Sequence, residues 1–538
     1  MAAQTLALPA QPPALPTGFK KWIIVITAIT AAIVELIDTS IVNVGLNDIA
    51  GSLGVTIEDV SWVVTSYAIA NVIVIPMTGF LQRYFGRKNY YIGSIILFTL
   101  SSYGCGFATN LETLILFRFL QGVGGGALLS TSQGLIYDAF PMSQRALASA
   151  LFGMGIVLGP TLGPTLGGYI IDNYHWSWMF YINVPIGILA AFLSIAYIDK
   201  KADEVNIDRK SIQIDQLGIL LLAVGIGSLQ YVLERGEADD WFDDKTIQWL
   251  TVAAVIAIPA FIWWELRGTK EPVVDLRTLK NRNLSIGSIL MVVIGYGLFT
   301  SVLLYPLFAQ RIVGLTATQT GKLLIPGGLV TLPMFALAGR LLAKGISPRI
   351  LVAVGYVAFS SFCFIMSTYT MDTPDNFFIY ALIIRGIGLA FVNVPLINQS
   401  VSTLEPRQLP TGIAIVNMMR QVGGAFGVAI TNTYVTQRVA VHRGDLVSNL
   451  QPGNPILTER LNAMTQGLAA RGVNALDAVT GAYKNLDLII SKQALMISYL
   501  DTFKLAGLFF VVSFPLLFLL KSKKMDAATA KAVADAAH

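Results

Sequence analysis

The stretch Trp22–Leu46 reads WIIVITAITAAIVELIDTSIVNVGL, and its only charged residues are Glu35 and Asp38. A helix of about 20 apolar residues spans the hydrocarbon core of a bilayer, which is about 30 Å thick. The run is too long for the apolar part of a cleaved signal peptide, which holds about 7–15 residues. The stretch therefore predicts a retained membrane-spanning helix with two carboxyl groups at membrane depth.

Similar apolar runs recur along all 538 residues of the chain. Hydrophobic residues make up 54% of the sequence and charged residues 13%, whereas a soluble protein has about 25% charged residues. We therefore predict an all-α membrane protein with fourteen membrane-spanning helices. The predicted spans are 22–46, 59–81, 90–109, 112–136, 146–171, 177–198, 214–233, 246–266, 284–306, 319–341, 349–369, 376–398, 409–433 and 496–520.

The distribution of basic residues predicts the orientation of these helices, because Lys and Arg concentrate in the cytoplasmic loops of membrane proteins. If the N-terminus is cytoplasmic, the cytoplasmic segments are rich in basic residues and the short outer loops are poor in them. The cytoplasmic group includes Lys20, Lys21, Arg83, Arg87, Lys88, Arg145, Lys200, Lys201, Arg267, Lys270, Arg277, Lys280, Arg282, Arg340, Lys344, Arg349 and Lys521, and the outer group is Arg235, Lys245, Arg311 and Lys322. An even number of spans then places both termini in the cytoplasm.

Similar patterns of glycine and arginine occur in the two halves of the chain. The matching pairs are Gly79 and Gly339, Arg118 and Arg385, and Gly155 and Gly423, with separations of 260, 267 and 268 residues. Internal repeats of this kind are common in transporters. The separation is longer than six helices require, so the repeat predicts two six-helix bundles with two further helices, 214–233 and 246–266, inserted between them.

The predicted domain plan follows from the spans and the repeat. It has a disordered cytoplasmic tail at 1–21, an N-terminal six-helix bundle at 22–198, two inserted helices with linkers at 199–283, a C-terminal six-helix bundle at 284–520 containing an extracytoplasmic loop at 434–495, and a cytoplasmic tail at 521–538. The loop is polar and has helix-forming stretches near 457–468 and 474–490. One interpretation is that this loop has no function of its own. The other is that it forms a surface that caps the cavity or binds a periplasmic adaptor.

Short motifs in fixed order resemble those of a known family. In the first span, the relevant residues are Leu36, Asp38, Thr39, Val42, Asn43 and Val44; the second ends with Gly79, Leu81, Gly86, Arg87 and Lys88; the fourth has Arg118, Gln121, Gly122 and Gly124; the fifth has Gly155, Gly159, Pro160, Gly163, Pro164, Gly167 and Gly168; and the sixth begins with Trp176–Gly187. Together they resemble the EmrB/QacA-like branch of the Major Facilitator Superfamily, the fourteen-helix drug:proton antiporters. The resemblance covers about residues 22–435 and the last helix.

The resemblance implies a transporter that works by alternating access, with conformational motifs at Gly79, Gly86 and Arg87. One position departs from the family pattern. Arg83 stands where the superfamily's loop motif usually has an acidic residue, which can pair with a basic residue to latch the cytoplasmic side. The departure predicts that this latch is weakened or built from other groups.

Glu35 and Asp38 are the strongest candidates for proton coupling. They lie three residues apart and therefore share one face of a helix. Ionisable groups are costly inside a membrane and usually functional, and burial together with a neighbouring carboxylate favours proton binding. Arg118 on a neighbouring helix of the family fold would hold or orient Asp38. The alternative is that Asp38 and Arg118 form a structural pair that locks two helices together.

The fifth span carries a glycine row with two prolines. Glycine permits close helix approach, and proline removes a backbone hydrogen bond and softens the helix. The row therefore predicts a hinge at a moving interface between the bundles, with ordinary tight packing as the alternative. Its residues are Gly155, Gly159, Pro160, Gly163, Pro164 and Gly167.

Aromatic and amide side chains in several spans are candidates to line a central cavity. Large apolar cavities with few polar groups suit hydrophobic or amphipathic ligands. The alternative for each of these side chains is contact with lipid or ordinary packing. The candidates are Trp62, Tyr67, Tyr296, Tyr305, Asn393, Asn398, Asn417 and Gln421.

Other classes of function have little support in the sequence. The two cysteines and three histidines are scattered, which predicts no metal site, and no nucleotide or nucleophile motif predicts an enzyme or a cofactor. The net charge of +5 resides mostly in loops between apolar runs, so it does not predict nucleic-acid binding. A scaffold or sensor is a further alternative, against which the costly membrane charges argue.

We therefore predict a proton-coupled antiporter that exports hydrophobic or amphipathic compounds across a bacterial cytoplasmic membrane. Its expected partners are membrane lipid, protons, a small amphipathic substrate and, in a host with two membranes, a periplasmic membrane-fusion adaptor. The alternative is a facilitator-type transporter of one defined solute, such as a siderophore or a sugar. The glycine row and the pair Glu35 and Asp38 favour the antiporter.

Overall fold

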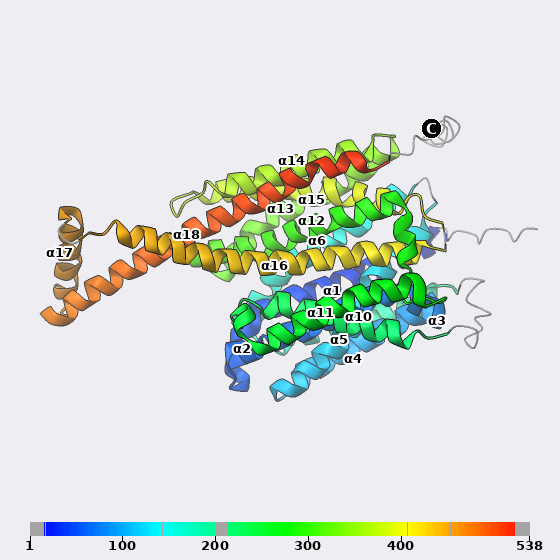
Figure 1. The fold of residues 1–538 in the computed structure, drawn as a ribbon, viewed down its shortest axis with the longest axis horizontal. Coiled ribbons are helices and arrows are strands. Elements are labelled where there is room, and N and C mark those ends of the chain that lie inside the picture. The colour runs from blue at the N-terminus through cyan, green and yellow to red at the C-terminus, as the bar shows by residue number, and fades with distance from the viewer. Residues whose placement is uncertain are drawn as a thin grey trace, which may run out of the picture.

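The computed structural model describes residues 16, 18–141, 144–200, 213–405, 407–451 and 454–521. Within these ranges the chain forms long helices and no strands. Most of the helices run roughly parallel to the long axis of the molecule (Figure 1). The predicted tails lie largely outside the described residues, although the first helix already begins at Gly18.

The described residues of the first half of the chain form six long helices and two short ones. They are α1 (Gly18–Leu53), α2 (Ile57–Val60), α3 (Trp62–Phe85), α4 (Arg87–Phe107), α5 (Leu111–Ala139), α6 (Arg145–Asn173), α7 (Trp178–Tyr181) and α8 (Asn183–Tyr197). Two further long helices, α10 (Gln216–Arg235) and α11 (Lys245–Trp263), pack against each other. The linker after them contains the single-turn helices η3 (Trp264–Gly268) and η4 (Leu276–Lys280).

The second half repeats the arrangement of six long helices. It contains α12 (Arg282–Phe308), α13 (Ala317–Ala343), α14 (Pro348–Met366), α15 (Asp375–Val401), α16 (Leu409–Ser448), α17 (Pro455–Ala469) and α18 (Ala475–Ser513), with the short helices η5 (Ala309–Val313) and η6 (Phe514–Leu519). Every predicted span coincides with a helix of the structure.

Thirteen helices of the described residues are long and apolar enough to cross a membrane. The remaining predicted span, 90–109, corresponds to α4, which is 21 residues long and therefore about 32 Å in length. Polar side chains such as Ser94, Thr99 and Ser102 lower its hydropathy, but all three are buried. Since α4 packs against α5 and α8, these polar groups face protein and not lipid.

The internal repeat is visible in how the helices pair. In the first half α1 packs on α6, and α5 packs on α3 and α4; in the second half α12 packs on α16, and α15 packs on α13 and α14. The turns that follow α3 and α13 also correspond, because Gly86 has φ +81° and Gly345 has φ +85°. Both glycines adopt a backbone conformation that is costly for other residues. The two halves are therefore equivalent bundles.

The segment predicted as a loop at 434–495 is largely helical. Helix α16 continues to Ser448 and α18 already begins at Ala475, so both run beyond the predicted spans. A 40-residue helix such as α16 is about 60 Å long, which is twice the thickness of the hydrocarbon core. The two helices project together from one end of the bundle and carry α17 at their tip (Figure 1). We call residues 434–495 the helical hairpin.

The two bundles meet along α6 and α13 and along α3 and α16. A Cβ atom on Gly79 would lie 2.8 Å from Oγ1 of Thr411, so the bundles touch near the end where α3 stops. A Cβ atom on Gly321 would lie 2.6 Å from Oγ1 of Thr165, near the other end of α6 and α13. The bundles are therefore in contact toward both ends of the interface.

Candidate site for protons and substrate

Asp38 lies at the centre of a buried hydrogen-bond network inside the N-terminal bundle. Its Oδ2 accepts a hydrogen bond from Nη1 of Arg118 at 2.6 Å. Its Oδ1 accepts from Nε2 of Gln121 at 2.9 Å and from Nδ2 of Asn183 at 2.8 Å. None of these side chains is more than 1% exposed. Both carboxylate oxygens are thus satisfied, as a buried charge requires.

Four helices place these groups. Arg118 and Gln121 are three residues apart on α5 and therefore project from one face, where Nη1 of Arg118 also donates to Oε1 of Gln121 at 2.8 Å. Asn183 is the first residue of α8. Nδ2 of Asn183 and Nε2 of Gln121 also donate to Oγ of Ser102 on α4, each at 3.1 Å. The network therefore joins α1, α4, α5 and α8.

The guanidinium of Arg118 is held on its other sides by α3. Its Nε donates to the carbonyl of Val63 at 3.0 Å, and its Cζ lies 4.3 Å from the centroid of the Tyr67 ring. An arginine over an aromatic face gains a cation–π attraction, which is strongest where water is excluded. Arg118 is therefore fixed by Asp38, a backbone carbonyl and a ring.

Glu35 lies on the same face of α1 but has fewer partners. Its Oε1 accepts from Nδ2 of Asn71 at 3.1 Å and from the hydroxyl of Tyr67 at 3.3 Å. Its Oε2 is buried and has no hydrogen-bond partner among the described residues. The Glu35 side chain is 2% exposed. Two neighbouring carboxyl groups thus have different surroundings, one paired with a cation and one held only by neutral donors.

The C-terminal bundle meets this region through α16. Nδ2 of Asn417 donates to Oγ of Ser130 at 3.2 Å and to Oε1 of Gln133 at 3.1 Å, both on α5. Nε2 of Gln421 lies 3.5 Å from Oδ1 of Asn71 on α3. These contacts cross from one bundle to the other. Asn71 also donates a hydrogen bond to Glu35, so a single side chain links the Glu35 carboxyl group to the interface between the bundles.

The eight predicted cavity residues fall into two groups. Tyr67 contacts Glu35 and Arg118, and Asn417 and Gln421 contact the opposite bundle, as described above. The other five make different contacts. Trp62 packs on Tyr231 of α10 with ring centroids 5.3 Å apart, Tyr296 packs on Phe509 at 4.5 Å, and Tyr305 packs on Phe378 at 6.4 Å. Nδ2 of Asn393 donates to the carbonyl of Leu389, and Asn398 has a buried Nδ2 without a partner among the described residues.

The glycine row of α6 does not face the other bundle. Its members are four residues apart and form one stripe, which packs on α1. A Cβ atom on Gly155 would lie 3.2 Å from Ile29, one on Gly167 would lie 3.0 Å from Ile41, and Cβ atoms on Gly159 and Gly163 would overlap Leu36 and Ser40. Pro160 and Pro164 lie inside a continuous helix. The row therefore holds α6 against the helix that carries Glu35 and Asp38.

The loop motif between α3 and α4 contains two ion pairs. Arg87, which follows Gly86, pairs with Asp138 near the end of α5. Nη1 of Arg83 lies 3.7 Å from Oε2 of Glu271, and its Nη2 donates to the carbonyl of Pro272 at 3.3 Å. The acidic partner near Arg83 thus comes from the linker after the inserted helices.

Sequence reasoning quoted Gln121 and Asn183 only as motif residues and did not assign them to Asp38. It also missed Asn71, Ser102 and Gln133. The sequence did offer a clue to these residues, because burying a side-chain amide in an apolar span costs free energy unless the amide has hydrogen-bond partners. The sequence does not say which helices face each other, so the partners could not be named.

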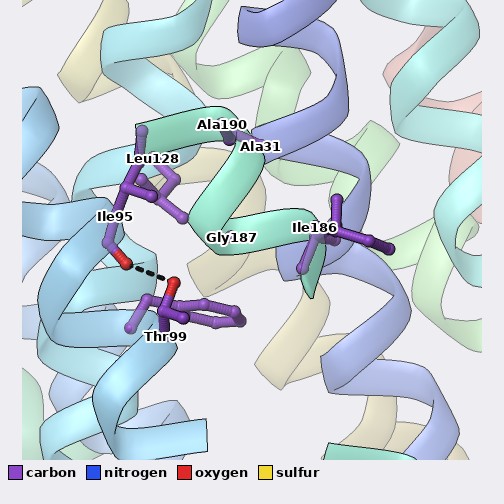
Figure 2. Close-up of a pocket in the computed structure, with 9 residues that line it drawn as sticks. Ala31, Ile95, Thr99, Leu128, Ile186, Gly187 and Ala190 are labelled. Carbon is purple, nitrogen blue, oxygen red and sulfur yellow. Dashed lines mark hydrogen bonds between the residues drawn. The ribbon is translucent and has the colours of Figure 1, made fainter. Parts of the chain in front are cut away.

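Figure 2 shows a small apolar void within the N-terminal bundle, near Ala31, Thr99 and Gly187. Its volume is about 10 Å³, roughly that of one water-sized probe. The hydroxyl of Thr99 donates a hydrogen bond to the carbonyl of Ile95, so it offers no free donor to the void. The void is too small for a substrate. Among the described residues, no group of three or more His, Cys, Asp or Glu could hold a metal ion.

Comparisons with known proteins bear on this arrangement. The profile of the Major Facilitator Superfamily matches residues 28–428. The chain is 35% identical over 477 residues to the multidrug export protein EmrB of Escherichia coli (strain K12), covering 88% of this chain and 91% of that protein. It is 32% identical to the fatty acid resistance protein FarB of Neisseria gonorrhoeae, covering 91% of this chain and 94% of that protein.

A solved structure with the same fold is that of the human organic anion transporter MFSD10 (TETRAN). The TM-score is 0.57 at 14% identity, and the match covers 94% of this chain and 100% of that one. The predicted fold class is confirmed by this likeness together with the helices described above. The chain belongs to the Major Facilitator Superfamily of multi-pass membrane transporters.

Proposed function

We propose that this protein is a proton-coupled antiporter that exports hydrophobic or amphipathic compounds by alternating access. The observation that carries the proposal is the pair Glu35 and Asp38, buried on one face of α1. Carboxyl groups at membrane depth are rare unless they take part in transport or proton movement. The names of the bacterial relatives, which refer to multidrug export and fatty acid resistance, agree with this assignment.

The two carboxyl groups have separate tasks in this proposal. Asp38 is held in place by Arg118, Gln121 and Asn183, which all donate hydrogen bonds to it. Glu35 has only neutral donors and one oxygen without a partner among the described residues, so it is the better proton carrier in this conformation. Its partner Asn71 contacts Gln421 of the opposite bundle. Separation of the bundles would therefore change the surroundings of Glu35 directly.

The proposed location is a bacterial cytoplasmic membrane with both termini in the cytoplasm. The excess of basic residues in alternate loops supports this orientation, and it places the helical hairpin on the outer side. Cysteine labelling with a membrane-impermeant maleimide tests it, using Glu459→Cys in the hairpin and Lys270→Cys in the linker, in a background without Cys105 and Cys363. We expect labelling of the first site in intact cells and of the second only after permeabilisation.

We also propose that the helical hairpin receives a membrane-fusion adaptor in a host with two membranes. The hairpin projects well beyond the bundle (Figure 1), and exposed apolar residues such as Ile456, Leu476 and Leu488 decorate it. Burial of these side chains against an adaptor would remove apolar surface from water, which favours association. Replacing all three with Ser should weaken adaptor capture without changing the proton flux of the reconstituted transporter.

The test of the proposed function is substrate-induced proton flux in proteoliposomes under an imposed pH gradient. Wild-type protein is compared with Glu35→Gln, Asp38→Asn and the control Asp172→Asn, whose side chain is exposed, over lipophilic cations and amphipathic acids. Flux in the wild type and the control, with none in the two buried variants, supports antiport. Transport of one solute that ignores the pH gradient in every protein would instead establish the facilitator.

A further inference from the structure

Arg420 is a buried cation on the face of α16 that meets the N-terminal bundle. The side chain is 2% exposed. Asn417 and Gln421, three residues before and one after it, both contact the opposite bundle. Residues three or four apart share a helix face, so Arg420 belongs to the same interface.

Close packing on α12 fixes the backbone of α16 at this point. A Cβ atom on Gly295 would overlap the carbonyl of Arg420, and one on Gly427 would lie 2.8 Å from the carbonyl of Tyr296. The backbone of Arg420 therefore cannot approach α12 more closely. Glu35 of the opposite bundle is close enough for its charge to act on that of Arg420.

The guanidinium of Arg420 lacks the partners that a buried arginine normally has. Its Nε and Nη1 are buried and have no hydrogen-bond partner among the described residues. Oε2 of Glu35 is unpaired in the same way, and the two groups are not hydrogen-bonded to each other. Leaving buried charged donors unpaired is costly, and such groups in a transporter interface indicate a ligand.

The charges around the interface favour a negatively charged ligand. Asp38 and Arg118 neutralise each other. Arg385 of α15 bonds to Oγ of Ser301 at 3.0 Å, and no carboxylate within the described residues pairs with it or with Arg420. Glu35 is thus the acidic side chain whose charge acts on Arg420, whereas Arg385 lies within the C-terminal bundle beside Ser301 and Tyr305. When Glu35 carries a proton, the net charge around Arg420 becomes more positive.

We propose that Arg420 is the residue that binds the anionic head group of amphipathic substrates, and that it thereby contributes to substrate specificity. This inference rests on the proposed transport function and names its substrate class. Arginine presents parallel N–H donors that match a carboxylate, and the apolar membrane domain suits an attached hydrophobic group. Ionised Glu35 competes with the bound anion for Arg420, so neutralising Glu35 should strengthen anion binding.

The test measures equilibrium binding to the full-length protein in lipid nanodiscs, without a proton gradient. Three fluorescent probes share one ring system and differ in head group: 2-naphthoate, 2-naphthylmethanol and (2-naphthylmethyl)trimethylammonium. Empty nanodiscs correct for lipid partitioning. The proteins are wild type, Arg420→Gln, Arg420→Lys, Glu35→Gln and the control Arg385→Gln, each checked for folding by its thermal unfolding midpoint.

Wild-type protein should prefer 2-naphthoate over the other two probes. Arg420→Gln should weaken naphthoate binding by about tenfold to a hundredfold, as expected for lost charge-assisted hydrogen bonds, and leave the neutral probe unaffected. Arg420→Lys should restore part of the affinity, Arg385→Gln should keep the preference, and Glu35→Gln should tighten naphthoate binding.

Equal weakening of all three probes in Arg420→Gln would assign Arg420 a structural role and overturn the proposal. A wild-type preference for the cation would overturn it even if the arginine variants fail to fold. The result is separable from the proposed function, because binding needs no gradient. Anion preference without substrate-induced proton flux would reject antiport alone, and flux without anion preference would reject this inference alone.

Discussion

Arg118 and Asp38 form an ion pair of 2.6 Å in which neither side chain is more than 1% exposed. The two residues are 80 positions apart in sequence and come from α5 and α1. Removing one partner of a buried pair usually costs about 3–5 kcal/mol, because the other charge remains buried. The stability of the N-terminal bundle therefore depends on both members of the pair.

Asp38→Asn should abolish substrate-induced proton flux and also lower thermal stability, because Arg118 loses its counter-charge while the amide preserves the shape. Glu35→Gln should abolish the flux with a much smaller loss of stability, because Glu35 has no cation bonded to it. Flux assays and thermal unfolding of the same preparations check both effects. Equal destabilisation by the two variants would contradict the separate tasks given to these carboxyl groups.

Gly163→Val should destabilise the protein by about 1–3 kcal/mol, because it inserts a branched side chain into a packed interface. A Cβ atom at this position would overlap Ser40 on α1. The control is Gly134→Ala on α5, where nothing lies within 4 Å of the added atom. That change should be neutral or stabilise the helix by about 0.5–1 kcal/mol. Thermal unfolding in detergent measures both, and a stable Gly163→Val would disprove close contact with α1.

The two ion pairs of the loop motif should differ in strength. The side chains of Arg83 and Glu271 are 51% and 44% exposed, whereas those of Arg87 and Asp138 are 13% and 30% exposed. Exposed pairs contribute about 0–1 kcal/mol. Double-mutant cycles on transport rate should therefore show stronger coupling for Arg87 with Asp138. A larger coupling for Arg83 with Glu271 would make the linker after α11 the main latch.

Asp501→Asn should loosen the base of the helical hairpin. Oδ2 of Asp501 accepts from Nη2 of Arg438 at 2.7 Å and lies 2.8 Å from Nε2 of His442, and its side chain is 15% exposed. We expect faster hydrogen exchange in the hairpin part of α16.

The matched control for this change is Asp487→Asn, at an Arg443 pair whose carboxylate is 55% exposed. Exchange should barely change there, because water screens the pair. Similar exchange in both variants would mean that the two helices are held together by apolar contacts alone.

The sequence predicted the fold well because membrane helices carry their own signal. An apolar run long enough to cross a bilayer satisfies its backbone internally, so the fourteen spans could be counted without tertiary information. Even the less apolar α4 was found in this way. The repeat was equally accessible, since Gly86 and Gly345 have the same backbone conformation for the same local reason.

The prediction was weaker wherever the answer depended on which helices face each other. Polar helices such as the hairpin part of α16 have no apolar run to mark them, so the helical hairpin was expected as a loop. The stripe containing Gly163 was assigned to the interface between bundles, whereas it packs on α1. Only part of the site could be predicted from the sequence. Glu35, Asp38 and Arg118 stand out because they are charged residues in apolar spans, but the roles of Asn71 and Asn183 depend on which residues lie beside them in the fold.

The unbroken length of α16 gives the molecule a mechanical lever. Arg420 is 28 residues before the end of this helix at Ser448, a distance of about 42 Å along the axis. A tilt of roughly 10° about Arg420 would sweep the far end through about 7 Å for a helix of this rise per residue. A displacement too small to see beside the carboxyl groups would thus be magnified at the tip, where a spectroscopic label could follow each transport cycle from outside the membrane domain.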